Sequence, residues 1–330
     1  MVSGYMNFEK GTHIAGVILN NISGKRHADT IVKAMEHHCG IPVLGILPKD
    51  HSLCIPERHL GILPAGEHSE AEGMIEQISD FFERNADIDR IISVACSAPD
   101  LPDQQIRPLK PVNAAVKIGV LYDRVFTFYY PENLRALEQA GAELVHIDSL
   151  HDIHLPDVDA LYIGGGFPEL YAAELEANVS LRKNIMQSAG DGLPVYAECA
   201  GLMYLCRSIR IAQKAYQMCG VMEADVTISK KPVGHGYVMS EVVRDNPFFT
   251  KGAVIYGHEF HYSRLTYDRA PEFACRMRRG FGVNGINDGL MFNNVVASYV
   301  HIHAWGVPEW APAFVRTAAA RHAEKRTVKV

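Results

Sequence analysis

The side chain best suited to covalent chemistry is that of Cys199. It stands in residues 194–205, PVYAECAGLMYL, where an apolar β-type run leads into the cysteine, then small residues, then an apolar helical pattern. This order predicts a strand, a sharp turn and a helix, with the thiol at the carboxyl end of a sheet and the backbone N–H groups of the turn facing its target. A buried core thiol is the alternative, and it is the commoner state of a lone cysteine.

A thiol nucleophile needs a base, and His301 is the candidate. It lies in the apolar run of residues 295–303, VVASYVHIH, where it shares a face with His303. A nucleophilic cysteine and its histidine are usually far apart in sequence and meet only in the fold. The chain has 16 histidines, so residue types alone do not decide the pairing.

Three consecutive glycines, residues 164–166, follow the buried strand expected at residues 160–163. Such a run marks backbone that bends sharply or comes close to a ligand. An ordinary strand-to-helix turn is the alternative, and the run lacks the GxGxxG spacing of a dinucleotide loop.

Buried strands alternate with helices along the chain, which predicts doubly wound α/β layers. Helices are expected at residues 29–39, 69–84, 131–140, 169–189 and 308–324, and strands at residues 13–21, 41–48, 117–123, 143–147, 160–163, 193–198 and 295–303. A hairpin is expected to turn at residues 287–289, Asn-Asp-Gly. Four prolines in residues 98–115 mark a linker between two domains.

Composition limits the possible partners and the compartment. The chain has 330 residues, 48% of them hydrophobic, and a net charge of −6. Acidic and basic residues are interspersed, so we expect neither nucleic acid nor a membrane surface as a partner. Seven cysteines without a CxxC pair are typical of reduced thiols, and no apolar run is long enough to span a bilayer, so a cytoplasmic location is expected.

Five ordered motifs carry a family resemblance: FYYPENLRALEQAGAEL from residue 128, GGGFPELYAAEL from 164, AECAGLMYL from 197, YGHEFHYS from 256 and ASYVHIH from 297. Together they resemble the amidotransferase domain of the cobyrinic acid a,c-diamide synthase family, the corrinoid branch of the class I glutamine amidotransferases. GVILNN from residue 16, GIPVLGILPKD from 40 and PERHLGILPAGE from 56 resemble the second half of that family's ATP-binding domain, which is similar to dethiobiotin synthetases.

The resemblance implies a domain order. Residues 1–97 would be the C-terminal half of a doubly wound, dethiobiotin synthetase-like ATP-binding domain. Residues 98–115 would be the linker, residues 116–322 a flavodoxin-like α/β glutamine amidotransferase domain, and residues 323–330 a tail.

It also implies a function, the glutamine-dependent amidation of the a- and c-acetate carboxylates of cobyrinic acid. Cys199 would attack the glutamine amide to form a thioester, and His301 would move the proton to the departing ammonia. Backbone N–H groups of Gly165, Gly166 and Ala200 would hold the oxyanion. The ammonia would then react with a carboxylate that ATP has activated as an acyl phosphate.

The sequence departs from the family pattern in three ways. His303 stands where many class I enzymes have a glutamate, so a Cys–His dyad is expected, and Ala200 replaces the usual glycine after the nucleophile. No GxxxxGK[ST] phosphate loop occurs, so the chain is expected to lack the first half of the ATP-binding domain. ATP and Mg²⁺ are the family's cofactors, and Asn20 and the loop at Pro48 would lie near adenine. No protein metal site is expected.

Several alternatives stay open at this stage. The chain could be a glutaminase subunit that needs a separate ATP-binding chain bearing the phosphate loop, or half of a homodimer, or a binding fragment with an idle nucleophile. The acceptor could be cobyrinic acid, its cobalt-free counterpart hydrogenobyrinic acid, or sirohydrochlorin with or without nickel. In each enzymatic case L-glutamine and a tetrapyrrole carboxylate are the expected small-molecule partners.

One further motif resembles a metal site. In residues 258–261, HEFH, the two histidines are three apart in an expected strand, whereas a zinc-binding HExxH places them four apart on a helix. Glu259 or His261 is therefore expected to form a polar wall of the glutamine or ammonia site, or to be a structural hydrogen-bond partner.

Overall fold

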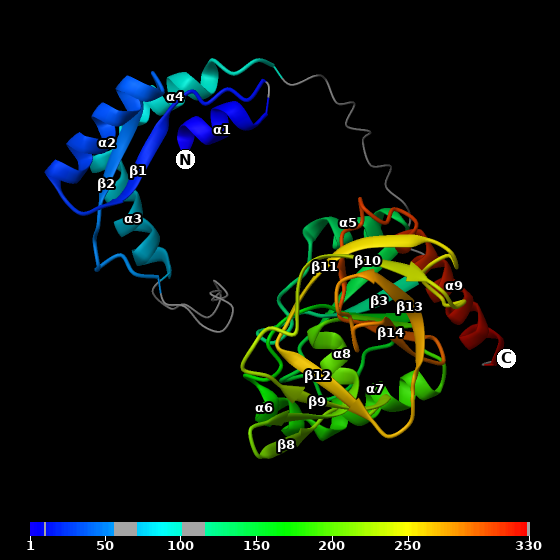
Figure 1. The fold of residues 1–330 in the computed structure, drawn as a ribbon. Coiled ribbons are helices and arrows are strands. Elements are labelled where there is room, and N and C mark those ends of the chain that lie inside the picture. The colour runs from blue at the N-terminus through cyan, green and yellow to red at the C-terminus, as the bar shows by residue number, and fades with distance from the viewer. Residues whose placement is uncertain (10, 56–70, 101–115, 329–330) are drawn as a thin grey trace. The chain divides into compact units, whose positions relative to one another are not determined.

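The computed structural model describes residues 1–9, 11–55, 71–100 and 116–328 (Figure 1). The segment from residue 56 with its PERHLGILPAGE motif, and most of the expected linker at residues 98–115, lie outside the described residues. The chain divides into two compact units, Met1–Arg107 and Pro108–Val330, and each is described by itself.

The amino-terminal unit is a small α/β layer. Two parallel strands pair in one sheet, and Val17 lies opposite Val43. The elements are α1 (Val2–Phe8), β1 (Val17–Ile22), α2 (Lys25–His38), β2 (Val43–Pro48), α3 (Ala71–Asn85) and α4 (Ile88–Cys96). Helices α2, α3 and α4 contact the strands, and Ile22, Met35 and Leu44 are buried among them.

Local chemistry fixes two boundaries of this unit that the sequence patterns did not predict. Helix α2 begins at Lys25, four residues before the predicted start, after Gly24. Helix α4 was not predicted, and its first turn is stabilised because the Asp87 carboxylate accepts a hydrogen bond from the Arg90 amide at 3.0 Å. Helix α1 has no buried residue.

The second unit is organised by a ten-stranded sheet in the order β16-β11-β10-β13-β14-β15-β6-β5-β3-β4. Its parallel half comprises β3 (Val116–Leu121), β4 (Ala142–Ile147), β5 (Ala160–Ile163), β6 (Val195–Glu198) and β15 (Val295–Ser298). Every residue of β5, β6 and β15 is buried, which explains why these strands read as continuous apolar runs.

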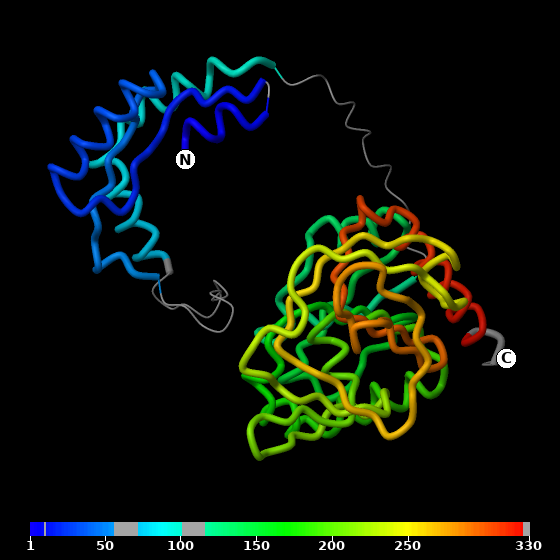
Figure 2. The backbone as a smooth tube through the Cα atoms, viewed as in Figure 1, coloured from blue at the N-terminus to red at the C-terminus, as the bar shows by residue number. Residues whose placement is uncertain are grey.

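The other half of this sheet is antiparallel. Its strands are β10 (Gly234–Val242), β11 (Val254–His261), β13 (Glu272–Arg279), β14 (Asn287–Phe292) and β16 (His301–Ile302). Only Tyr299 and Val300 separate β15 from β16 in the chain, yet four strands separate them in the sheet. The antiparallel half therefore curls back until its last strand reaches the end of β15. This half of the sheet is the yellow-to-orange part of the tube in Figure 2.

Helices and a second sheet cover the ten-stranded sheet. The helices are α5 (Pro131–Gln139), α6 (Ala172–Ala177), α7 (Val179–Gly190), α8 (Ala200–Leu205) and α9 (Trp310–Val328), and the four-stranded sheet comprises β7 (Cys206–Ile211), β8 (Lys214–Gln217), β9 (Met222–Ile228) and β12 (Ser263–Tyr267). Alternate residues of β5 and β6 point into two separate cores: Ile163 packs in the core with α7 and α8, and Tyr162 in the core with Trp310 of α9.

Three sequence predictions for this unit are wrong. The single strand predicted at residues 295–303 is two strands, β15 and β16, which lie apart in the sheet, and His303 follows β16 and does not share a strand face with His301. The single helix predicted at residues 169–189 is two helices, because the chain breaks at Asn178, whose side chain caps α7 by accepting from the Leu181 amide. The hairpin predicted at residues 287–289 turns instead at Asn293 and Asn294, between β14 and β15. Asp288 lies within β14, where its buried carboxylate accepts hydrogen bonds from the amides of Tyr299 and Val300. Its residue type, which is common in turns, was therefore misleading.

Candidate active site

Cys199 occupies a strained turn between β6 and α8. Its backbone angles are φ 47° and ψ −96°, a conformation that costs a non-glycine residue free energy and needs support from its surroundings. The Cys199 amide donates to the Ser298 carbonyl at 2.7 Å, and the Gly201 amide donates to the Gly164 carbonyl at 3.1 Å. A Cβ at Gly201 would lie 2.4 Å from the Ile163 carbonyl oxygen, so only glycine lets α8 start this close to β5.

The imidazole of His301 lies against the glycine run that follows β5. A Cβ at Gly165 would come within 2.5 Å of Cε1 of His301. The glycine therefore gives the ring its space, and it explains why the sequence has no side chain there. His301 itself is 8% exposed and Cys199 is 7% exposed, so both groups are largely shielded from water.

Cys199 and His301 contact each other. Burial by itself lowers the pKa of His301, but hydrogen bonding and charge interaction with Cys199 and Glu198 outweigh it and raise that pKa to about 10. At neutral pH the ring is therefore an imidazolium, the form that stabilises a neighbouring thiolate. Such an arrangement can activate a cysteine thiol for nucleophilic attack.

A buried carboxylate, Glu198, completes this group. Its Oε2 lies 3.7 Å from Nδ1 of His301, and the side chain is almost fully buried. Sequence reasoning missed Glu198. The available signal was a charged residue as the last position of an otherwise apolar strand, next to the candidate nucleophile.

A second histidine, also missed, flanks the first. The His258 ring stacks on that of His301 with centroids 4.9 Å apart and planes 16° from parallel. Burial, together with the charge on His301, lowers the pKa of His258 to about 4. His258 is therefore neutral when His301 is charged. Its Nδ1 lies 3.5 Å from the hydroxyl of Tyr130.

The backbone amides expected to hold an oxyanion differ in whether they already donate a hydrogen bond within the protein. The Gly165 amide donates to the Phe128 carbonyl at 3.2 Å, so it is already bonded. Ala200 is the first residue of α8, and amides in the first turn of a helix have no acceptor within that helix. Gly166 is packed so tightly that a Cβ would overlap the Val125 carbonyl oxygen at 1.8 Å.

The chain matches the model of the CobB/CobQ-like glutamine amidotransferase domain over residues 117–308. A curated cobyrinate a,c-diamide synthase of Methanosarcina acetivorans is 39% identical to it, over 96% of this chain and 69% of the relative. Synthases of the same name from Magnetococcus marinus and Methanothermobacter thermautotrophicus are 38% and 39% identical and are covered to 69% and 70%.

The chain belongs to the cobyrinate a,c-diamide synthase family. Among solved structures, PurLQS of Thermotoga maritima is 19% identical and covers 63% of this chain, with a TM-score of 0.47.

The side chains of the HEFH segment make structural contacts in this family member. Glu259 is buried and accepts hydrogen bonds from the Phe281 and Gly282 amides at 2.6 and 2.7 Å. His261 stacks on Tyr299 with ring centroids 3.7 Å apart. Within the described ranges, no group of three or more metal-binding side chains occurs. Of the two roles expected for Glu259, a polar wall of the site or a structural hydrogen-bond partner, these contacts correspond to the second.

The other residues selected from the sequence, Asn20 and Pro48, lie in the amino-terminal unit. They stand near the carboxyl ends of the adjacent parallel strands β1 and β2, where Ile22 pairs with Pro48. Asn20 accepts a hydrogen bond from the amide of Asn21 at 2.8 Å. This edge of a parallel sheet is where ligands bind in open α/β folds.

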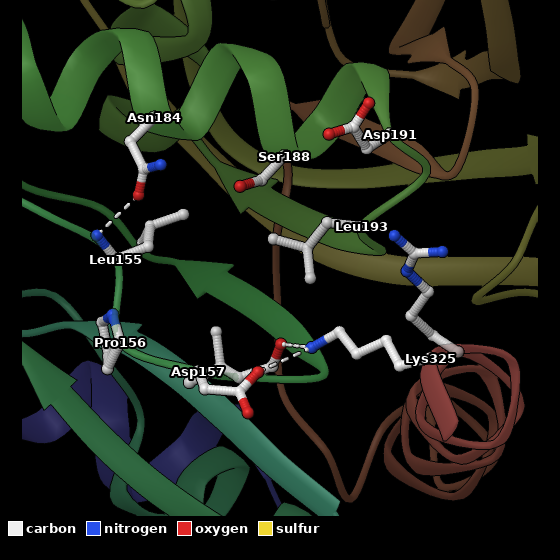
Figure 3. Close-up of a pocket in the computed structure, with 10 residues that line it drawn as sticks. Leu155, Pro156, Asp157, Asn184, Ser188, Asp191, Leu193 and Lys325 are labelled. Atoms are coloured by element: carbon white, nitrogen blue, oxygen red, sulfur yellow. Dashed lines mark hydrogen bonds and ion pairs between the residues drawn. The ribbon is translucent and has the colours of Figure 1, made fainter. Parts of the chain in front are cut away.

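The second unit has a cavity of about 310 Å³ at the amino ends of its parallel strands, opposite the end that carries Cys199 (Figure 3). It is lined by residues such as Leu155 and Leu193, which precede β5 and β6, whereas Cys199 follows β6. Lys325 pairs with Asp157 there at 3.1 Å. The cavity is therefore separate from the thiol. Among the described residues, no helix has the length and apolarity to cross a membrane.

Proposed function

We propose that this chain catalyses the glutamine-dependent amidation of the a- and c-acetate carboxylates of cobyrinate. The identity to named cobyrinate a,c-diamide synthases, over 96% of the chain, supports this acceptor. The observation that carries the chemistry is the thiol of Cys199, held at a strained strand-to-helix turn in contact with the imidazolium of His301. Such a site hydrolyses glutamine and supplies ammonia.

Each residue then has a defined task. The Cys199 thiolate attacks the side-chain amide carbon of glutamine, and His301 gives a proton to the departing ammonia, leaving a thioester. The imidazole next takes a proton from water, the hydroxide attacks the thioester, and the C–S bond breaks. We assign the oxyanion contacts to the amides of Gly166 and Ala200, because the Gly165 amide is engaged by Phe128.

The amino-terminal unit is proposed to be part of a dethiobiotin synthetase-like ATP-binding domain, with adenine near Asn20 and Pro48. The parallel pairing of β1 and β2 across helix α2 supports this, because nucleotides bind at the carboxyl ends of such strands. The part of this unit that the structure describes brings no three metal-binding side chains together, so we assign no Mg²⁺ ligand. ATP would supply the phosphoryl group that converts the acceptor carboxylate into an acyl phosphate, and ammonia would attack that acyl carbon with loss of phosphate.

A second chain belongs to this proposal. No GxxxxGK[ST] loop occurs in the sequence to bind the ATP phosphates, so a partner carrying that loop would complete the ATP step. Glutamine hydrolysis does not depend on it. The two half-reactions can therefore be tested apart.

The first test is intact-mass measurement after treatment with an electrophilic glutamine analogue. We expect one adduct in the wild-type chain, none in Cys199→Ala, and one in Cys54→Ala, which removes an exposed thiol. Adducts that persist in Cys199→Ala would contradict the assigned nucleophile.

The second test supplies glutamine, ATP, Mg²⁺ and cobyrinate, and follows the acceptor by mass spectrometry. Conversion to the diamide by the chain alone supports the full reaction. Conversion only after a phosphate-loop-bearing chain is added supports the two-chain form. Amidation of sirohydrochlorin in preference to cobyrinate would overturn the assigned acceptor.

A further inference from the structure

The carboxylate of Glu198 is held in one position by a buried network. Its Oε1 accepts from the Tyr196 hydroxyl and from the Ile302 amide, each at 3.2 Å, and its Oε2 accepts from the Tyr162 hydroxyl at 3.1 Å. Tyr162 and Tyr196 are opposite each other on β5 and β6, so both hydroxyls reach the end of β6 from the same face. Three donors from three segments leave the carboxylate little freedom.

The same network fixes the segment that carries His301. The Ile302 amide is bound by Glu198, and the Ile302 carbonyl accepts from the side chain of Asn133 at 2.9 Å. Asn133, fully buried on α5, also accepts from the Ala304 amide at 2.7 Å. Strand β16 is thus held from both sides, and the His301 ring is set with Nδ1 towards Glu198.

The position two residues after His301 does not serve this purpose. Nε2 of His303 lies 3.6 Å from the Glu132 carboxylate. The His303 ring packs against that of Tyr130, with ring centroids 4.7 Å apart. Among the described residues, Glu198 is the carboxylate that forms an ion pair with His301. No lysine or arginine in that part of the chain forms one with Glu198, so its charge is compensated by the histidine and the three donors.

We propose that Glu198 is a positioning residue of the glutaminase site, holding Nδ1 of His301 so that Nε2 faces the thiol of Cys199. The acid of a Cys–His–acid arrangement then comes from the residue before the nucleophile, and the site is a triad in place of the expected dyad. This inference rests on the proposed function. The proton that His301 gives to ammonia is replaced by one from water.

The test compares Glu198→Gln with Glu132→Gln, because each removes a carboxylate from within 4.0 Å of one histidine. Ammonia release from glutamine is measured against pH. For Glu198→Gln we expect kcat to fall about 10²-fold with little change in KM. The alkaline limb of the profile should move to lower pH, because His301 loses its proton more easily, and Glu198→Asp should restore part of the rate.

Glu132→Gln should leave that alkaline limb where it is in the wild type. A folded Glu198→Gln variant with the wild-type limb and kcat would overturn the proposal. If the alkaline limb shifted in Glu132→Gln and not in Glu198→Gln, the positioning role would belong to Glu132 and His303. That result would also overturn the proposal.

A second measurement needs no Glu198 variant. In ¹⁵N spectra of the wild-type chain, with His301 assigned by its loss in His301→Gln, Nδ1 should carry a proton at every pH at which the chain is folded. A neutral ring protonated only at Nε2 would overturn the proposal. If the wild type releases no ammonia and forms no adduct with the glutamine analogue, the proposed function fails, and these spectra still decide the orientation of His301.

Discussion

His258 and His301 stack face to face, with ring centroids 4.9 Å apart, and their pKa values move in opposite directions. The pKa of His258 falls to about 4 through burial and the charge of its neighbour, whereas that of His301 rises to about 10 through Cys199 and Glu198. Between these values the pair holds one proton. A neutral ring against an imidazolium avoids the repulsion of two like charges in a buried site.

This pair predicts how stability depends on pH. Both rings would titrate near 6.5 in the unfolded chain. Below pH 6.5 the unfolded chain binds a proton that His258 does not, so stability falls as pH drops towards 4. Above pH 6.5 His301 keeps a proton that the unfolded chain releases, so its contribution is lost as pH rises towards 10.

Calorimetric melting temperatures across pH 4 to 10 check this. His258→Phe should flatten the acid side of the curve, and His301→Gln should flatten the alkaline side. Unchanged slopes in both variants would show that neither ring is perturbed by its surroundings.

A second prediction concerns Gly165. A methyl group there would meet Cε1 of His301 at 2.5 Å, so Gly165→Ala should displace the ring from Cys199. A displacement of a catalytic group by about 1 Å costs about 10²-fold in rate. Ammonia release from glutamine is the measurement. The control is Gly190→Ala, whose added methyl has no atom within 4 Å and which should keep the wild-type rate.

A third prediction concerns Gly166. Its Cβ would lie 1.8 Å from the Val125 carbonyl oxygen, and backbone cannot yield as a side-chain tip can. Gly166→Ala should therefore lower the free energy of unfolding by more than 1 kcal/mol, roughly the upper half of single-mutation effects. Chemical denaturation measures the change, and an effect within about 0.5 kcal/mol of Gly190→Ala would be evidence against the tight packing.

A fourth prediction concerns Asn133, which bonds the Ile302 carbonyl and the Ala304 amide. Asn133→Ala leaves two buried backbone groups without a partner, at a cost of about 1 to 3 kcal/mol each. We expect a lower melting temperature and a slower glutaminase, because β16 carries His301. A variant with lower stability but wild-type kcat would show that β16 keeps its position without this side chain.

The turn that carries Cys199 could be predicted from the sequence because its signal is local. An apolar strand, a cysteine, small residues and a helix stand next to one another, and the structure places Cys199 at such a turn. The parallel strands could be predicted for the same reason, since full burial produces continuous apolar runs. His301 was one of 16 histidines and needed the family resemblance to be selected.

Other features are long-range and left no pattern in the sequence. The roles of Glu198 and His258 depend on contacts between strands more than forty positions apart in the chain. The curl of the antiparallel half depends on strand order, which hydrophobic alternation does not encode. The turn at Asn293 was missed because Asp288 and Gly289 have the stronger turn propensity, although burial and side-chain bonding keep them within β14.

The return of β16 to the end of β15 makes the contact between Cys199 and His301 depend on complete folding. Cys199 is placed by the parallel strands, but His301 arrives only when the whole antiparallel half has closed around to its last strand. Non-local pairing of this kind is slow to form, because loop closure must precede it. A folded chain whose antiparallel half opens therefore keeps Cys199 on the parallel strands but loses the imidazolium beside it, and its thiol becomes less reactive.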